Sequence, residues 1–176
     1  KKGWELRAGK GKIAFVTILN SGGLDVSIEA DLTAGRWHHI AGVWKDLSGL
    51  SLYVDGRLVG QREWRGYFET ELLELSFGRN PQWPERAFVG SIREVRIWEV
   101  ALNEQQIQTN MRRTIAGKER YLLGCWLLRG NIVEEVTGQL PARTAKPAVA
   151  ITGRPRSLYA ANIPLTGQGW IHAAVV

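Results

Sequence analysis

Short runs of alternating hydrophobic and polar residues fill most of the first hundred positions of the chain. This alternation predicts β-strands with one buried face, because successive side chains of a strand point to opposite sides of a sheet. Glycine, asparagine and serine bound the runs and mark turns. The predicted strands cover 12–19, 23–32, 37–45, 71–78 and 88–102, with a hairpin over 50–61. With no helix between them, they indicate an antiparallel sandwich or barrel.

The segment "LSLYVDGRLVGQ", residues 50–61, contains the clearest turn. Asp55-Gly56 lies between two alternating segments, and this dipeptide favours the two-residue hairpin turn that requires positive φ. Leu50, Leu52 and Val54 then share one face of the first strand. The pattern predicts a tight hairpin at this point.

The segment "WHHIAGVWK", residues 37–45, contains two adjacent histidines between two tryptophans. Strand alternation places Trp37 and His39 on one face and His38 and Trp44 on the other. Both faces are apolar, which predicts an interior strand with Trp37 and Trp44 as core contacts. Since the two histidines point to opposite faces, we do not expect them to bind one metal ion together.

One helix is predicted after the last of these strands. Asn103 is a suitable N-cap, and Gln106 three residues later resembles the second member of a capping box. Ile107 and Met111 fall on one face at helical spacing. We expect this helix to end near Gly117.

The chain changes in character after the helix. "YLLGCWLL", residues 121–128, predicts a further strand in which Cys125 is a small buried side chain. This cysteine is the only one, so an internal disulfide is excluded. Four of the six prolines then lie between positions 141 and 164. That segment is typical of extended loops, a linker or the opening of another module.

Two of these segments resemble laminin-G-like domains of the concanavalin A-like lectin/glucanase superfamily, in which pentraxin-like folds also occur. Residues 35–61 are similar to the central hairpin, with its Trp-His dipeptide and its Tyr-Val-Asp-Gly turn. Residues 88–107, "FVGSIREVRIWEVALNEQQI", are similar to the closing strand and short helix. The resemblance spans roughly residues 3–111. It implies an all-β fold, an antiparallel β-sandwich (jellyroll) with one short helix after the closing strand.

The domain organisation departs from the family pattern. Family domains have several strands before the point that matches Gly3, so the opening strands are missing here or are supplied elsewhere. Residues 122–139 resemble the family's opening strand and its following turn. They are either the start of a second module, which we prefer, or a rearranged strand that completes the first sheet. We therefore divide the chain into a jellyroll, 1–118, and an extra strand with a loose tail, 119–176.

Charge and hydropathy narrow the choice of partners. The chain has 23 lysines and arginines against 17 aspartates and glutamates, a formal net charge of +6. A basic protein favours anionic partners, but the positive residues are scattered, which argues against nucleic acid as the partner. No apolar run reaches the roughly 20 residues of a membrane span. The resemblance implies an extracellular or cell-surface location.

The resemblance also raises the question of calcium, which many relatives bind through loop oxygens. Here Arg93 stands where the closing motif usually has an aspartate. Calcium requires about six to eight oxygen ligands, and aspartates are few in this chain. We expect no metal or other cofactor. The alternative is a calcium site made by Asp46, Asn80 and backbone carbonyls.

Glycosidases occur on related jellyrolls, and one pair of carboxylates in this chain has a spacing that suits their chemistry. Glu29 and Asp31 lie on the same side of one predicted strand, about 7 Å apart at ideal strand rise, within the range that glycoside hydrolysis needs. The related glycosidases have a third alternating carboxylate, and Thr33 stands at that position here. An exposed strand face explains the pair equally well. We expect no enzymatic activity and keep a glycoside hydrolase as a remote alternative.

The better candidate site is the loop "GRNPQWPERAF", residues 78–88, where two prolines restrict the backbone. A tryptophan among hydrogen-bonding side chains suits a sugar face or a peptide anchor, although the indole could instead cover the core. The candidate ligand-binding residues are Trp83, Asn80, Arg79, Gln82 and Arg86. We predict a non-catalytic, lectin-like recognition module that binds a glycan or a protein surface within a larger multidomain protein. The alternative is a structural jellyroll that packs against other domains of its parent.

Overall fold

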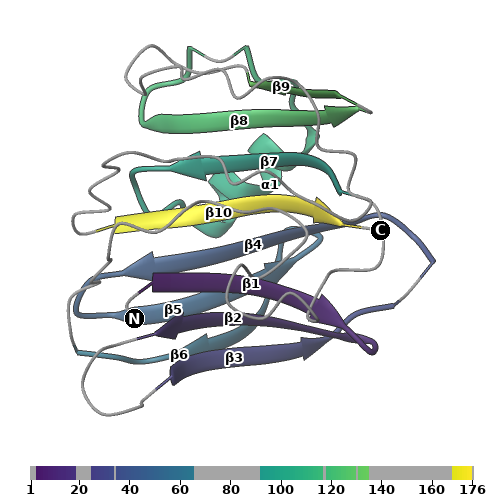
Figure 1. The fold of residues 1–176 in the computed structure, drawn as a ribbon. Coiled ribbons are helices and arrows are strands. Elements are labelled where there is room, and N and C mark those ends of the chain that lie inside the picture. Colours follow the sequence, from purple (N-terminus) through teal and green to yellow (C-terminus); the bar gives the residue numbers. More distant parts are fainter. Residues whose placement is uncertain are drawn as a thin grey trace.

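In the computed structural model, the described residues form two antiparallel sheets and one short helix (Figure 1). The structure describes residues 3–18, 25–33, 35–65, 92–116, 118–129, 131–134 and 168–175. The smaller sheet has the order β1 (Gly3–Gly9), β2 (Lys12–Ile18), β3 (Asp25–Asp31). Antiparallel strands with one helix confirm the predicted all-β fold class.

The larger sheet has seven strands in the order β6-β5-β4-β10-β7-β8-β9. Their bounds are β4 His38–Lys45, β5 Gly49–Val54, β6 Arg57–Arg62, β7 Ile92–Trp98, β8 Leu122–Arg129, β9 Asn131–Glu134 and β10 Gln168–Val175. The strand β10 lies between β4 and β7 and pairs antiparallel with both. The last described strand of the chain therefore joins two segments that resemble the family motifs.

The arrangement of β8 and β10 bears on the organisation of the chain after residue 118. β8 pairs with β7, and β10 fills the space between β7 and β4, so both belong to the same sheet as the central hairpin. This is the arrangement expected if the segment after the helix completes the first sheet. The division of the chain into modules at residue 118 stays a prediction.

The first hydrophobic core lies between the two sheets. Phe15 on β2 and Ile40, Trp44 and Leu52 on the facing strands are almost fully buried, with Trp126 of β8 in the same cluster. Leu50 and Leu52 of β5 are buried in this core as predicted, and Val54 on the same face is partly buried against it. Tyr53 on the other face is buried in a second cluster. Figure 1 shows the small sheet stacked on the half of the large sheet that β4, β5 and β6 form.

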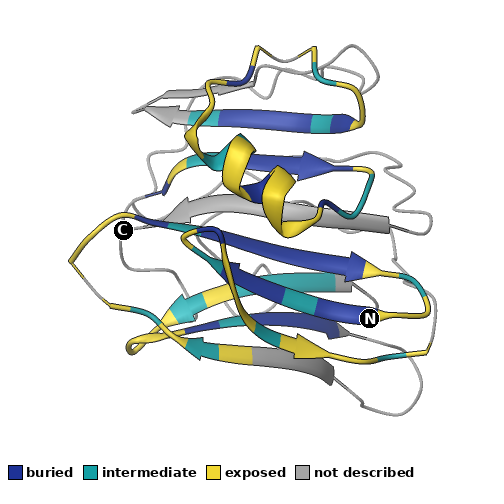
Figure 2. Cartoon of the chain, turned by 180° about the vertical axis from the view of Figure 1, so that it is seen from behind, coloured by how far each residue is buried: buried dark blue, intermediate teal, exposed yellow. Residues whose placement is uncertain are grey.

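The second core lies on the opposite face of the large sheet, under the helix α1 (Glu104–Arg112). Figure 2 shows this helix lying over the large sheet and coloured mostly as exposed. Ile107 is fully buried there, together with Ala41, Val43 and Cys125. The predicted burial of Cys125 is confirmed. Within the described residues, the structure has no helix with the length and hydropathy needed to cross a membrane.

The helix begins as predicted and ends earlier. The Asn103 side chain accepts a hydrogen bond from the Gln106 backbone, and the Gln106 side chain accepts one from the Asn103 backbone, each at 2.9 Å. These reciprocal bonds are a capping box. The helix ends at Arg112, not near Gly117, because Arg113 adopts an extended backbone conformation with φ −95° and ψ 137°.

A glycine in β4 allows close approach of the two sheets. A Cβ atom at Gly42 would lie 2.6–2.9 Å from three ring atoms of Phe15. We expect Gly42→Ala to lower the free energy of unfolding by about 2 kcal/mol, because overpacking displaces a buried aromatic ring. Gly9→Ala is the matched control, since nothing lies within 4 Å of a Cβ there. Urea unfolding measures both, and equal losses in the two variants would contradict this account of the contact.

Candidate functional site

The five residues of the predicted binding loop lie outside the described residues. Arg79, Asn80, Gln82, Trp83 and Arg86 all belong to the segment 66–91. Their assignment as a ligand site stays a prediction. The candidate site that can be built from described residues lies instead at one edge of the large sheet, where β4 and β7 begin.

The sheet topology brings two distant segments together at this edge. β10 is antiparallel to both of its neighbours, so β4 and β7 run in the same direction and begin at the same edge. The register confirms this, since Val175 at the end of β10 is paired with His38 on one side and Ile92 on the other. Residues immediately before or at the start of these two strands can therefore meet across the end of β10.

Trp37 and Arg93 meet there. The Arg93 guanidinium carbon lies 5.6 Å from the centroid of the Trp37 ring, within the range of a cation–π contact. Trp37 is 49% exposed, so the prediction that it is a core contact is wrong. The physical reason is that β4 begins one residue later, at His38, which is the residue held in the interior. We call Arg36, Trp37 and Arg93 together the Trp37 rim.

The rim rests on a polar network that His38 and Asp55 form. His38 is 3% exposed, and its Nδ1 lies 2.9 Å from Oδ2 of Asp55. The other carboxylate oxygen accepts a hydrogen bond from the His39 backbone at 2.9 Å, and the Asp55 backbone donates to the His39 carbonyl at 2.7 Å. Asp55 and Gly56 have φ of 52° and 77°, which confirms the predicted hairpin turn.

The helix fastens the same turn from the other side. Nε2 of Gln108 donates to the Gly56 carbonyl at 3.0 Å. A Cβ atom at Gly56 would lie 2.9 Å from Cγ of Gln108 and about as close to Met111. The hairpin, the start of β4 and α1 therefore form one fixed unit beside the rim.

We expect Asp55→Ala to lower the free energy of unfolding by about 2 kcal/mol. The substitution leaves the His39 backbone N–H and the His38 ring without their acceptor, and alanine adopts positive φ less readily than aspartate. Asp55→Asn is the matched comparison, because asparagine retains one acceptor oxygen and tolerates positive φ. Chemical denaturation of both variants is the measurement. A loss from Asp55→Asn as large as that from Asp55→Ala would show that the acceptor and the turn geometry matter little.

The ring of His38 is engaged at both nitrogens. Nε2 lies 2.8 Å from the Thr33 carbonyl and 3.2 Å from Nε of Arg36. The Asp55 carboxylate accepts the hydrogen bond from Nδ1, and Nε2 is enclosed by the Thr33 carbonyl and the Arg36 side chain. The Asp55 and His38 pair therefore positions the rim, and it presents no open ring nitrogen to a substrate or a metal.

Electrostatics sets the state of Asp55. Burial acts to raise the pKa of its carboxyl group. The hydrogen bonds from the His39 backbone and the His38 ring, with the charges of His38 and Arg36, outweigh burial and hold this pKa below its usual value. Asp55 is consequently ionised at neutral pH, as its role as a double acceptor requires.

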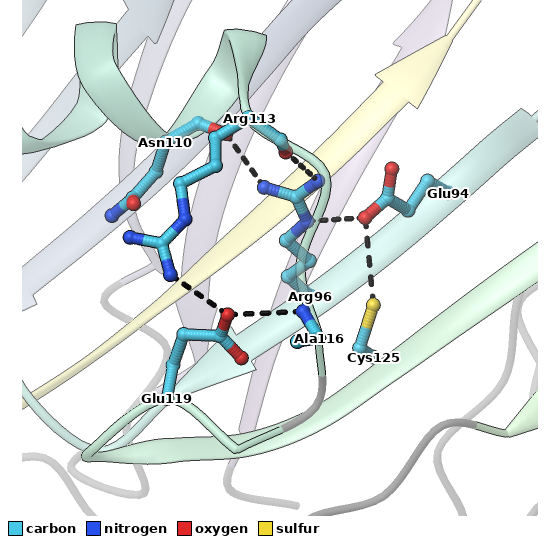
Figure 3. A network of polar contacts seen from close by, with 7 residues as sticks. All are labelled: Glu94, Arg96, Asn110, Arg113, Ala116, Glu119 and Cys125. Atoms are coloured by element: carbon cyan, nitrogen blue, oxygen red, sulfur yellow. Dashed lines mark hydrogen bonds and ion pairs between the residues drawn. The ribbon is translucent and has the colours of Figure 1, made fainter.

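A second polar network lies on the helix side of β7 (Figure 3). Arg96 is 2% exposed and donates from Nη1 to the Asn110 carbonyl at 2.7 Å and from Nη2 to the Arg113 carbonyl at 3.0 Å. Its Nε is paired with the Glu94 carboxylate, which the Cys125 thiol also approaches at 3.4 Å. The last carbonyls of a helix lack hydrogen-bond donors within the helix, and the Arg96 guanidinium supplies such donors here.

The network continues into the segment after the helix. Oε1 of Glu119 accepts hydrogen bonds from Nη2 of Arg113 at 2.9 Å and from the Ala116 backbone at 3.0 Å (Figure 3). The Arg96 guanidinium therefore holds the end of α1 against β7, and Glu119 fixes the turn towards β8. This is the physical reason why the helix stops before Gly117. The alternating Glu94 and Arg96 of the closing motif are thus structural residues.

The carboxylate pair considered for glycoside hydrolysis is exposed on β3. Asp31 accepts a hydrogen bond from Nζ of Lys12 on the neighbouring strand. That hydrogen bond and the lysine charge hold the pKa of Asp31 below its usual value. A general acid working at neutral pH needs a raised pKa, so the geometry gives Asp31 the properties of a surface ion-pair partner. Glu29 is exposed beside it.

The described residues include no cluster of metal-binding side chains. No group of three or more histidine, cysteine, aspartate or glutamate side chains that could hold a metal ion occurs among the described residues. Asp46, considered above as a calcium ligand, accepts a hydrogen bond from the Trp44 indole at 2.8 Å. Asn80, its suggested companion, lies outside the described residues.

The sequence also matches a known protein family. A family model described as the concanavalin A-like lectin/glucanases superfamily matches residues 1–108. The chain belongs to this superfamily. No curated protein and no solved structure gave a significant match.

Membership of the concanavalin A-like superfamily confirms the resemblance drawn from residues 35–61 and 88–107. The superfamily includes both binding modules and enzymes, so it fixes the scaffold and leaves the activity open. The motif residues that revealed it have structural roles here, since His38 and Asp55 fasten the hairpin and Arg96 fastens the helix. Sequence reasoning missed Trp37 as an exposed residue. Arg93, which replaces the aspartate expected in the closing motif, was the signal that could have pointed to the rim.

Proposed function

We propose that this concanavalin A-like chain is a non-catalytic recognition module that binds a glycan or a protein surface at the Trp37 rim. The observation that supports the proposal most directly is the half-exposed Trp37 ring with the Arg93 guanidinium at 5.6 Å. An exposed indole presents a large apolar area to water, and a ligand that covers this area gains binding free energy. The loop around Trp83 remains a second candidate surface of the same module.

The rim is suited to binding because its backbone is held before a ligand arrives. His38 follows Trp37 directly and is fixed by Asp55 and the Thr33 carbonyl. The hairpin that carries Asp55 is fixed in turn by Gln108 of α1. A surface that is already ordered loses little conformational entropy on binding, and this raises its affinity.

A glycan array tests the proposal with the wild-type chain and two variants, Trp37→Ala and Trp83→Ala. We expect the wild type to give specific signals that Trp37→Ala abolishes, while the circular dichroism and melting temperature of this variant stay close to wild type. Loss of signal only in Trp83→Ala would move the binding surface to the loop 78–88. A folded wild type that binds no glycan and no protein partner would reject the proposal.

The structural alternative is supported by a different surface. Leu58 and Val59 on β6, the outermost strand in the order of the large sheet, are 43% and 42% exposed. Apolar side chains on an outer strand suit packing against another domain. This alternative gains if Leu58→Ser with Val59→Ser abolishes association with a neighbouring domain of the parent protein and Trp37→Ala has no effect on it.

A further inference from the structure

We propose that β10 exchanges between copies of this chain: the strand of one copy takes the place between β4 and β7 of a second copy, and two chains form a strand-swapped dimer. The inference does not depend on the recognition function of the Trp37 rim, since it concerns the assembly of the sheet. Three observations support it: the position of β10, its sequence likeness to β4, and the length of chain before it.

The position of β10 makes it the strand that completes the large sheet. In the strand order of the described residues, it is the one neighbour that β4 and β7 share (Figure 1). It pairs with β4 from Gln168 to Val175 and with β7 from Trp170 to Val175. An interior strand forms hydrogen bonds along both of its edges. A β10 strand from any copy of the chain therefore completes the same sheet.

The sequence of β10 repeats that of β4 and of the residues before it. When Trp170 is aligned with Trp37, residues 165–176 match residues 32–43 at six of twelve positions. The identical pairs are Leu32 with Leu165, Thr33 with Thr166, Trp37 with Trp170, His39 with His172, Ala41 with Ala174 and Val43 with Val176. Such self-similarity is the sequence signature of a repeated structural unit. β10 thus carries a second copy of the β4 motif.

The register makes the contact between these two copies of the motif reciprocal. Ile40 is paired with Ala173, the residue that aligns with it. The flanking pairs are His39 with Ala174, and Ala41 with His172. Each of these flanking pairs repeats the other with the strands exchanged, which is the relation found in the isologous contacts of two-fold dimers. The β4 motif therefore pairs with its own copy, and the β10 strand of a second chain offers the same residues in the same register.

The chain before β10 is long enough for exchange. β9 ends at Glu134 and β10 begins at Gln168. The positions between them, 135–167, span at most about 110 Å when extended, which exceeds the width of a small domain, about 30 Å. A swapped dimer contains the same strand pairs as two monomers, so exchange costs mainly the independent motion of the two chains. We therefore expect the dimer fraction to rise with protein concentration.

Exchange of β10 fits the described residues better than association through the outer strand β6. This strand begins at Arg57 and ends at Arg62, and both side chains are exposed. If two β6 strands paired antiparallel with their centres opposed, each Arg57 would face an Arg62 of the other copy. Like charges directly opposite each other destabilise a strand pair, and charged edge residues oppose edge-to-edge association. A second copy is therefore expected to join through β10.

Disulfide trapping in the full 176-residue chain tests the exchange. One chain carries Ile40→Cys and the other Ala173→Cys, the pair at the centre of the reciprocal register. The two chains are unfolded, refolded as a mixture at high concentration and oxidised. Opposed Cα atoms of adjacent strands lie about 4.5–5.5 Å apart, within the range that a disulfide spans. We expect a disulfide-linked dimer that contains one chain of each kind.

The matched control replaces Ala173→Cys with Ala174→Cys. This residue follows directly on the same strand, and its side chain points to the opposite face of the sheet. We expect at least tenfold less mixed dimer from Ile40→Cys with Ala174→Cys than from Ile40→Cys with Ala173→Cys. Equal cross-linking of the two mixtures would overturn the proposal, because the interface would then not contain this register.

Sizing of the refolded wild-type chain by analytical ultracentrifugation gives a result that does not depend on the substitutions. We expect a dimer whose fraction rises with the concentration at refolding. A wild type that stays monomeric at every concentration would overturn the proposal. An intramolecular disulfide in the double variant Ile40→Cys with Ala173→Cys, together with no mixed dimer from the single variants, would also overturn it, because β10 would then remain in its own chain.

Discussion

Arg96→Met is expected to lower the free energy of unfolding by about 3–5 kcal/mol, the range found when one partner of a buried ion pair is removed. The guanidinium is 2% exposed, and the Glu94 side chain with which it pairs is only 13% exposed. Its loss leaves that carboxylate without its cation and leaves the Asn110 and Arg113 carbonyls without their donor. Methionine keeps much of the side-chain volume, so the loss reports the polar contacts.

Two further variants make this result specific. Arg112→Met removes an exposed arginine from the last turn of the same helix, and its cost should stay below about 1 kcal/mol, the size of a helix-dipole contribution. The second is the double variant Arg96→Met with Glu94→Gln. Glutamine removes the carboxylate charge that Arg96→Met leaves without a cation, so this variant should lose less free energy of unfolding than Arg96→Met alone. Urea unfolding curves measure all three. A cost for Arg96→Met as small as that for Arg112→Met would show that the network does not fasten the helix.

The second large effect is a loss of stability on acidification. Burial lowers the pKa of His39 from 6.5 to about 4, with a further contribution from the Arg96 charge that the Asp55 charge partly opposes. In the unfolded chain the imidazole binds a proton below about pH 6.5, while the folded chain does not bind it until about pH 4. Each pH unit in this window costs about 1.4 kcal/mol. The free energy of unfolding should fall by about 3 kcal/mol from pH 7 to pH 4 through this residue.

The comparison with His39→Gln isolates the contribution of His39. Glutamine does not titrate, and the backbone N–H of residue 39 keeps its bond to Asp55 in this variant. The carboxyl groups of Asp31 and Asp55, whose pKa values hydrogen bonds hold below the usual 3.8, lose their contribution at lower pH. Between pH 6.5 and pH 4.5 the wild-type stability should therefore fall more steeply than that of the variant. Parallel curves would mean that the His39 ring is protonated in the folded state.

Local patterns predicted the parts of the fold that short-range physics determines. The hairpin at Asp55-Gly56 and the capping box at Asn103 depend on residues within a few positions of each other, and both are confirmed. The superfamily was likewise predicted from two contiguous motifs. The strand bounds agree with the predicted runs to within a few residues wherever those runs are described.

Features that depend on distant residues were not predicted. β10 lies in a segment taken for a loose tail, and its pairing with both β4 and β7 depends on positions more than seventy residues away. β1 was also missed, since the run after Gly3 mixes charged and small residues. The early end of the helix depends on Arg96, a residue of another strand.

The same reason explains the errors at the candidate site. Alternation alone extended the strand to Trp37 and made this residue a core contact. Asp55 binds His38, so His38 is the buried residue at the start of β4 and Trp37 before it is exposed. Arg93 was noted only as a departure from a calcium-binding pattern. Its place beside Trp37 follows from the insertion of β10, which no local pattern contains.

We propose that Trp37 serves binding while the motif residues around it serve the fold. The most direct test is to titrate the best glycan from the array into Trp37→Ala and to record the urea unfolding curve of the same sample. We expect at least a tenfold loss of affinity, with a change in the free energy of unfolding of about 1 kcal/mol or less, the size of an exposed cation–π contact. Unchanged affinity, or a loss of stability as large as that of Arg96→Met, would contradict it.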